Sequence, residues 1–150
     1  MPDRSVIAAD NSYAPAQRVW LDNSQPPQLL PPATSFARLV QPLDDGYLIV
    51  SFGRNRVERT GSIAWKRTDL MGPTTAVVVG HTVLVTENDA DRVSRLDLRT
   101  GKTINTFGDG ALKNPCGIAV GPTGEILVTG GFAESAMVSV SCLFPLFLVV

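Results

Sequence analysis

The sequence predicts an all-β protein, and three observations support this fold class. First, 44% of the 150 residues are hydrophobic, which is enough for a packed core and excludes a wholly disordered chain. Second, the 13 Gly and 11 Pro residues separate short apolar runs such as residues 76–79 and 126–128, a composition typical of many short strands joined by turns. Third, apolar and charged residues alternate along residues 92–98, which is the period of a strand.

The predicted strands recur at a nearly constant spacing. Four apolar strand cores end in a small or hydroxyl residue, at residues 6–9, 48–51, 83–86 and 126–129. Counted from Ile7 through Ile49 and Leu84 to Leu127, they follow one another at intervals of 42, 35 and 43 residues. Such a period indicates a repeat architecture in which each unit is one supersecondary structure.

Further strands complete each unit. A preceding apolar strand is predicted at residues 37–40, 76–79 and 117–120. A strand that begins with Arg-Val follows the core after a polar loop, at residues 18–21, 56–59 and 92–96. An outer strand is predicted at residues 60–65 and 103–108. Because the arginine of Arg-Val recurs in the first three units, we expect a structural role for it, paired with acids or carbonyls between neighbouring sheets.

A repeated unit of four strands in about 40 residues is typical of a β-propeller blade. The prediction is therefore an incomplete β-propeller of four-stranded antiparallel blades within residues 1–132, about three and a half blades in all. The repeat units are placed at residues 5–35, 36–70, 71–112 and 113–132. The stretch within residues 133–150 is mostly apolar and does not follow the repeat, and we expect it to be an apolar tail that lies outside the propeller.

The unit that begins at Asn114 resembles a known repeat. Residues 114–129 include Pro115-Cys116-Gly117-Ile118-Ala119-Val120 and are similar to the opening of an NHL repeat, which runs Pro-x-Gly-Ile-Ala-Val before a turn with Gly and an apolar strand. Residues 87–102 resemble the second half of such a unit. The six-bladed gluconolactonase/regucalcin-like and strictosidine-synthase-like families share this pattern. The resemblance implies a propeller that binds a protein or another macromolecule through its loops.

A closed six-bladed ring would need roughly 240 residues at about 40 residues per blade. We therefore expect the 150 residues to be part of a longer NHL-like protein, or to self-associate and so complete a ring.

The densest cluster of oxygen ligands lies at residues 87–91, where Glu87, Asn88 and Asp91 are candidate ligand-binding residues. Such groups suit Ca²⁺, which is the cofactor expected if the chain is part of a divalent-cation-dependent lactonase or hydrolase. A polar turn between strands explains the same residues, since EF-hand spacing is absent. The resemblance also counts against the enzyme, because Cys116 stands where the lactonase pattern has Asn in Pro-Asn-Gly. A non-enzymatic module is favoured, with no catalytic residue assigned.

A basic stretch contains Arg54, Arg56 and Arg59, which are candidates for an RNA or protein surface. The alternative is a solvated strand face that keeps a sheet edge soluble. The 13 basic and 14 acidic residues of the chain give a net charge of −1, which argues against a nucleic-acid partner. The one histidine, His81, lies in a turn, and the sequence offers no nucleophile for it.

The sequence predicts neither a secretory leader nor a transmembrane segment, and a membrane partner is not expected. The two cysteines, Cys116 and Cys142, form no disulfide framework. These features favour the cytoplasm.

Overall fold

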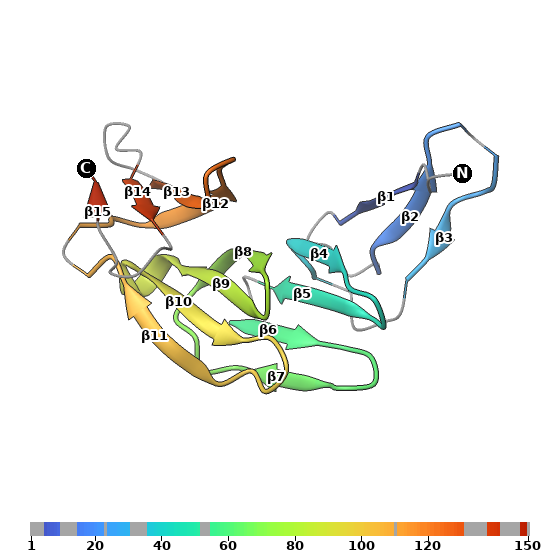
Figure 1. The fold of residues 1–150 in the computed structure, drawn as a ribbon. Coiled ribbons are helices and arrows are strands. Elements are labelled where there is room, and N and C mark those ends of the chain that lie inside the picture. The colour runs from blue at the N-terminus through green and yellow to red at the C-terminus, as the bar shows by residue number, and fades with distance from the viewer. Residues whose placement is uncertain are drawn as a thin grey trace.

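The computed structural model describes residues 5–9, 15–22, 24–30, 36–51, 55–109, 111–130, 138–141 and 148–149. In this part of the chain every regular element is a strand except the short 3₁₀ helix η3 (Asn88–Ala90), so the predicted all-β class is confirmed. The strands form four antiparallel sheets, one of three strands and three of four strands (Figure 1).

Each sheet is a meander in which strands adjacent in sequence are adjacent in space. Sheet A contains β1 (Ser5–Ala8), β2 (Gln17–Trp20) and β3 (Gln28–Leu29). Sheet B contains β4 (Leu39–Pro42), β5 (Tyr47–Ser51), β6 (Arg56–Arg59) and β7 (Trp65–Arg67). Sheet C contains β8 (Pro73–Val79), β9 (Thr82–Glu87), β10 (Arg92–Asp97) and β11 (Thr103–Phe107). Sheet D contains β12 (Pro115–Val120), β13 (Glu125–Gly130), β14 (Val138–Ser141) and β15 (Leu148–Val149).

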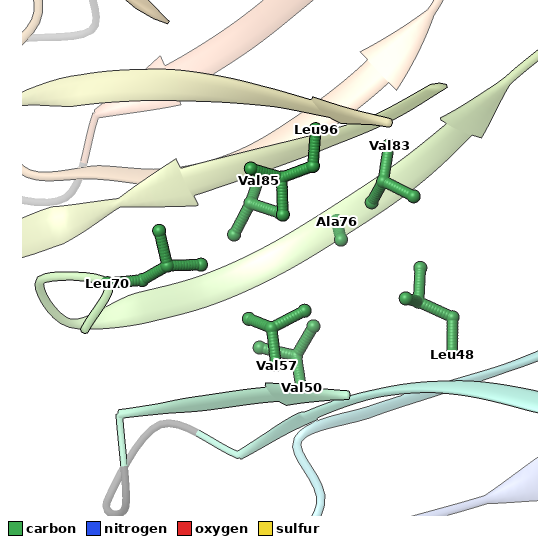
Figure 2. Packing of buried hydrophobic residues seen from close by; sticks show 8 residues of the cluster. All are labelled: Leu48, Val50, Val57, Leu70, Ala76, Val83, Val85 and Leu96. Carbon is green, nitrogen blue, oxygen red and sulfur yellow. The ribbon is translucent and has the colours of Figure 1, made fainter. Parts of the chain in front are cut away.

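Sheets B and C are apolar on both faces, and this lets consecutive sheets stack. Successive side chains of a strand point to opposite faces. In β5, Leu48 and Val50 pack in a cluster with residues of sheet C, whereas Ile49 packs with residues of sheet A. Figure 2 shows the cluster between sheets B and C, which consists of Leu48, Val50, Val57, Leu70, Ala76, Val83, Val85 and Leu96.

The same alternation joins sheet C to sheet D. Leu84 and Val93 point away from sheet B and form a second buried cluster with Ile126 and Val128 of sheet D. The apolar runs that predict strand cores in sheets B and C are therefore strands buried on both faces. β12 packs against β8 and β9, and β5 packs against β8, so neighbouring sheets approach each other through their early strands.

The hairpins follow from turn chemistry. Two residues, Gly80 and His81, connect β8 to β9, with Val79 paired to Thr82. Gly80 has a φ of 58°, a left-handed conformation that suits glycine in a tight hairpin turn. In sheets B, C and D the first two strands are joined by the loops 43–46, 80–81 and 121–124, and in sheets B and C the last two strands are joined by the loops 60–64 and 98–102. The edge of the stack formed by these loops is here called the turn edge.

Sheets B and C lie within the predicted units 36–70 and 71–112, whereas β14 and β15 lie in the predicted tail 133–150. β14 pairs with β13, and β15 pairs with β14, so the strand order of sheet D repeats that of sheets B and C. The division into a partial propeller over residues 1–132 and an apolar tail over residues 133–150 stays a prediction. Among the described residues no sheet closes on itself.

Candidate functional site

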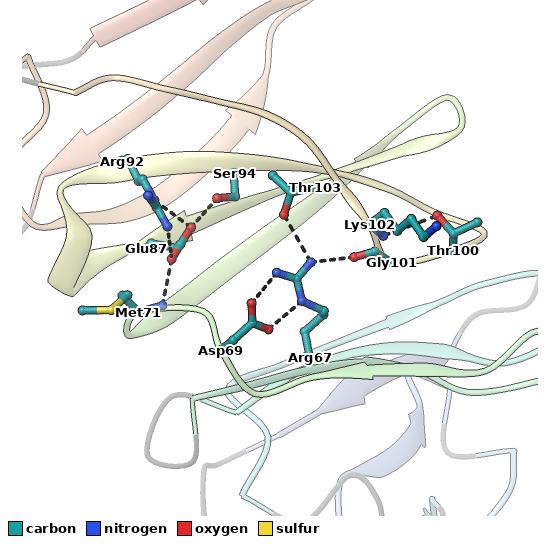
Figure 3. A network of polar contacts seen from close by, with 10 residues as sticks. All are labelled: Arg67, Asp69, Met71, Glu87, Arg92, Ser94, Thr100, Gly101, Lys102 and Thr103. Atoms are coloured by element: carbon teal, nitrogen blue, oxygen red, sulfur yellow. Dashed lines mark hydrogen bonds and ion pairs between the residues drawn. The ribbon is translucent and has the colours of Figure 1, made fainter.

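Glu87, the first of the candidate ligand residues, is a buried acid held by its own sheet. Its side chain is 0% exposed. Oε1 accepts a hydrogen bond from Arg92 Nε (3.1 Å) and one from the Ser94 hydroxyl, and Oε2 accepts from the Met71 backbone N–H (2.7 Å) and from Arg92 Nη2 (3.3 Å) (Figure 3). The charge of Glu87 raises the pKa of Arg92, chiefly through the side-chain hydrogen bond. Both carboxylate oxygens are thus occupied by protein donors.

Asn88 and Asp91 lie at the two ends of η3, and they hold loops together. The Asn88 N–H donates to the Gly72 carbonyl (2.9 Å). Asp91 Oδ1 accepts from the Asn114 N–H (2.7 Å), and Oδ2 pairs with Lys113 Nζ (3.1 Å). The Asn114 N–H, and after it Lys113, lower the pKa of Asp91. The turn between β9 and β10 is therefore tied to the loops on either side of sheet C.

The three candidates do not converge on one point that a cation could occupy. Within the described ranges, no group of three or more His, Cys, Asp and Glu side chains is close enough to hold a metal. Because Glu87 already accepts four hydrogen bonds, a cation there would have to displace Arg92. The Ca²⁺-dependent enzyme stays a prediction without support from the geometry of Glu87.

The candidate basic surface is divided by the structure. Arg54 lies outside the described residues. Arg56 and Arg59 begin and end β6, with side chains only 12% and 11% exposed. Arg56 lies 3.3 Å from Glu58 and donates to the Ser51 hydroxyl (3.2 Å). Arg59 belongs to the turn edge, and the role of these arginines in binding a macromolecule stays a prediction.

The recurring arginine takes equivalent partners in two sheets. Arg56 contacts a serine opposite it in register and a glutamate two residues further along its own strand, Ser51 and Glu58. Arg92 has Glu87 opposite it in register, and Ser94 two residues further along. The acid and the serine have exchanged positions between sheets B and C. Both arginines pair with an acid of their own sheet, which corrects the expectation of pairing between sheets.

A concavity of about 450 Å³ opens at the turn edge between sheets B and C. Its lining comes from three turns and from the ends of β6 and β10, and the residues are Arg59, Ile63, His81, Asp97, Leu98 and Arg99. Ile63 presents an apolar side chain that is 42% exposed. His81 and Arg99 are both exposed, so the rim carries nitrogen donors around an apolar patch.

The backbone of Leu98 fixes the geometry of this concavity. Its carbonyl accepts hydrogen bonds from Trp65 Nε1 (2.9 Å) and Arg59 Nη1 (3.2 Å), and its N–H donates to the His81 carbonyl (2.9 Å). Gly101 lies against the Trp65 indole, because a Cβ there would come within 2.6 Å of the ring. These contacts lock the last turn of sheet C onto sheet B.

Arg67 forms a second set of contacts between sheets B and C. Its guanidinium forms a two-pronged ion pair with Asp69, 2.6 Å on each side, and donates to the Gly101 carbonyl (2.7 Å) and the Thr103 hydroxyl (3.2 Å) (Figure 3). The hydrogen bond to Asp69 raises the pKa of Arg67 and lowers that of Asp69. Planar, bidentate pairing is what a guanidinium provides and an ammonium does not.

Two carboxylates near the concavity have lowered pKa values. Asp45 accepts from the Ser62 hydroxyl and N–H and pairs with Arg59 (3.0 Å), and the pKa of Asp45 is lowered to about 2, first by Ser62 and then by Arg59. Asp97 Oδ1 accepts from the Thr100 N–H (2.7 Å), and that backbone bond is the largest cause of its lowered pKa. The Ser62 hydroxyl and N–H both donate to the same carboxylate oxygen of Asp45, and these two hydrogen bonds stabilise the turn.

The concavity is not among the sites that the sequence predicts. The sequence singles out Arg59 for a different surface and His81 only as a lone histidine. The lining residues are separated by up to 40 positions, from Arg59 to Arg99, and no local pattern joins them. Only the stacking of sheets B and C brings them together.

No protein-family model matches the chain, and no curated protein shows significant similarity to it. In the part of the chain that the structure describes, no helix is long and apolar enough to span a membrane.

Proposed function

We propose that the chain forms blades of a β-propeller and acts as a non-enzymatic interaction module. Four-stranded meanders that stack face to face, with early strands against early strands, support the propeller. Loops at the edges of a rigid sheet stack are well placed for binding.

The concavity at the turn edge carries the functional proposal. Its volume of about 450 Å³ lies within the range of roughly 300–1,000 Å³ that is usual for ligand sites. An apolar patch at Ile63 and Leu98 beside Arg99 suits a polypeptide segment that carries an apolar side chain next to a carboxylate. Arginine is well suited to the carboxylate, because its guanidinium can form two parallel hydrogen bonds.

The site is preformed. Leu98 is fixed by Trp65, Arg59 and His81, so a bound segment would not have to order this turn. Preformed sites bind more tightly for a given contact area because less conformational entropy is lost.

A phage-displayed library of random peptides, panned against the full chain, tests this function. We expect enrichment of peptides that pair an acidic with an aliphatic or aromatic residue. Binding of the enriched synthetic peptide, measured by isothermal titration calorimetry, should weaken about tenfold or more in Arg99→Glu and in Ile63→Asp, because the first places like charges together and the second buries a charge.

Lys113→Glu is the matched control, since it reverses an exposed charge at the opposite edge of sheet C. The proposal is wrong if no peptide is enriched, or if the enriched peptides bind Arg99→Glu and Ile63→Asp as tightly as they bind the unaltered chain. Equal losses in Lys113→Glu would also contradict it, because they would reflect overall charge.

A further inference from the structure

A second concavity, of about 280 Å³, opens at the turn edge between sheets A and B. Arg18 of β2 lines one side of it, and residues 42–47 of the hairpin that joins β4 to β5 line the other side. The concavity between sheets B and C is built in the same way, because there Arg59 of one sheet lies beside the first hairpin of the next sheet. The two concavities share no lining residue.

Arg18 brings a guanidinium without a partner to the A–B concavity. It lies directly opposite Ile7 in register, and directly opposite residues lie on the same face of a sheet. Because Ile7 packs with residues of sheet B, Arg18 also lies on the face of sheet A that meets sheet B. Its Nε is buried without a hydrogen-bond acceptor, and within the described ranges its side chain forms no ion pair. Buried donors in proteins are nearly always hydrogen-bonded, so this guanidinium is suited to an acceptor from a ligand.

The arginines of the same Arg-Val pattern in sheets B and C show which acceptor such a group takes. Arg56 and Arg92 each pair with a glutamate of their own sheet. Arg18 has Ile7 and Gln28 opposite it, and neither side chain carries a charge. A guanidinium can bind a carboxylate through two parallel hydrogen bonds, so the acceptor that fits Arg18 is a carboxylate supplied by a ligand.

The hairpin across the concavity carries the opposite charge. Asp44 is exposed, and in the part of the chain that the structure describes its carboxylate forms no hydrogen bond or ion pair, with Arg18 or with any other group. Asp45, by contrast, is paired with Arg59. A cation and an anion thus line the same concavity without pairing with each other. Such an arrangement suits a ligand that carries both charges, whereas Asp44 would repel a phosphate.

We propose that the A–B concavity binds a free α-amino acid with an aliphatic side chain. Arg18 binds the carboxylate of the ligand, Asp44 binds its ammonium group, and its side chain lies beside Leu43 and Tyr47. The end of a peptide carries only one of these two charges, so the pair of groups favours the free amino acid. The volume of about 280 Å³ lies just below the roughly 300 Å³ at which sites for drug-sized ligands begin, which suits so small a ligand. This site is independent of the peptide site between sheets B and C.

Saturation-transfer difference NMR of the full chain with L-leucine tests the site. We expect saturation transfer to leucine, and a shift of the side-chain Nε–H signal that is absent from the spectrum of Arg18→Gln. Arg18→Gln should weaken leucine binding about tenfold or more, because hydrogen bonds to charged groups are lost. Lys66→Gln is the control, since it removes an exposed positive charge of β7 that does not line the concavity, and it should bind leucine like the unaltered chain.

Two leucine derivatives test the two charges separately. Leucinamide has no carboxylate, so it should bind the unaltered chain as weakly as it binds Arg18→Gln. N-acetyl-leucine has no ammonium group, so Asp44→Asn should not change its binding, whereas the same variant should weaken leucine binding about threefold. Asp44 is exposed and unpaired in the described part of the chain, so Asp44→Asn is expected to fold even if Arg18→Gln does not.

Three results would overturn the proposal. The first is the absence of saturation transfer to leucine. The second is an equal loss of leucine binding in Arg18→Gln and Lys66→Gln, which would reflect overall charge. The third is binding of leucinamide or of inorganic phosphate that is as tight as binding of leucine, because the site would then recognise only one charge.

Discussion

Replacing Glu87 by Gln should lower the free energy of unfolding by about 1–3 kcal/mol, the usual cost of leaving a buried donor unsatisfied. The side chain is 0% exposed and accepts hydrogen bonds on both oxygens from Met71, Arg92 and Ser94. Glutamine keeps the volume but has a single oxygen. Whichever way its amide is turned, an NH₂ group faces protein donors.

The orientation of the new amide determines the smallest loss of unfolding free energy that Glu87→Gln can cause. If its oxygen keeps the Met71 N–H, the NH₂ group faces Arg92 Nε and the Ser94 hydroxyl, which can turn to accept. Arg92 then loses its charged partner, but its side chain is 34% exposed and water can replace part of the bond. The loss on the Arg92 side is therefore small, and about 2 kcal/mol in total is the central expectation.

Urea unfolding followed by tryptophan fluorescence measures this change, and a loss of about 2 kcal/mol corresponds to a fall in Tm of roughly 4–8 °C for a chain of this size. Asp69→Asn is the comparison, because the Asp69 side chain is 66% exposed in its ion pair with Arg67, and its removal should cost about 1 kcal/mol or less. If Glu87→Gln unfolds within about 0.5 kcal/mol of the unaltered chain, the four-bond arrangement is not what stabilises sheet C.

Two further changes have specific outcomes. Gly101→Ala should destabilise the chain by about 2 kcal/mol more than Gly80→Ala in the same urea assay. Both glycines have a positive φ, but of the two only Gly101 would place a Cβ against a side chain, 2.6 Å from the Trp65 ring. Equal losses of stability in the two variants would mean that the Trp65 ring moves freely. The pKa of Asp45 is lowered from 3.8 to about 2 on folding, so its stabilising effect is full above pH 3.8 and is lost as the pH falls toward 2. Asp45→Asn should flatten the fall in stability over that window, and the neighbouring change Asp44→Asn should not; identical pH profiles would contradict the assignment.

The strands could be predicted because their signal is local. Apolar runs such as Leu48–Val50 and Val83–Val85 lie on strands buried on both faces. In β10 the predicted alternation holds only around Leu96, because Val93 and Ser94 are both buried and the strand packs on both faces. The strand Val138–Ser141 is not predicted, although apolar and hydroxyl residues alternate in it, because residues 135–150 carry no charge and are interpreted as an apolar tail. The period of two in this segment is the signal that could have identified the strand.

The candidate site could not be predicted in the same way. The Leu98 carbonyl accepts from side chains 33 and 39 positions earlier in the chain, and these distances in sequence follow from how sheet C packs on sheet B. Arg56 and Arg59 have the composition of a basic surface, yet each finds an acid within reach once β6 is paired. Charge counted along the sequence does not show which charges the fold neutralises.

The exchange of Glu and Ser around the recurring arginine shows what the repeat preserves. In sheet B the acid is on the arginine's own strand, and in sheet C it is on the neighbouring strand, but each arginine contacts one carboxylate and lies near one hydroxyl. A guanidinium with several donors can accept either arrangement, because both positions lie on the same side of the sheet within its reach. The sequence of the unit can therefore diverge at both positions while the charge balance inside the sheet is maintained. A repeat of this kind is recognised better by the spacing of its apolar strands than by the identity of its polar residues.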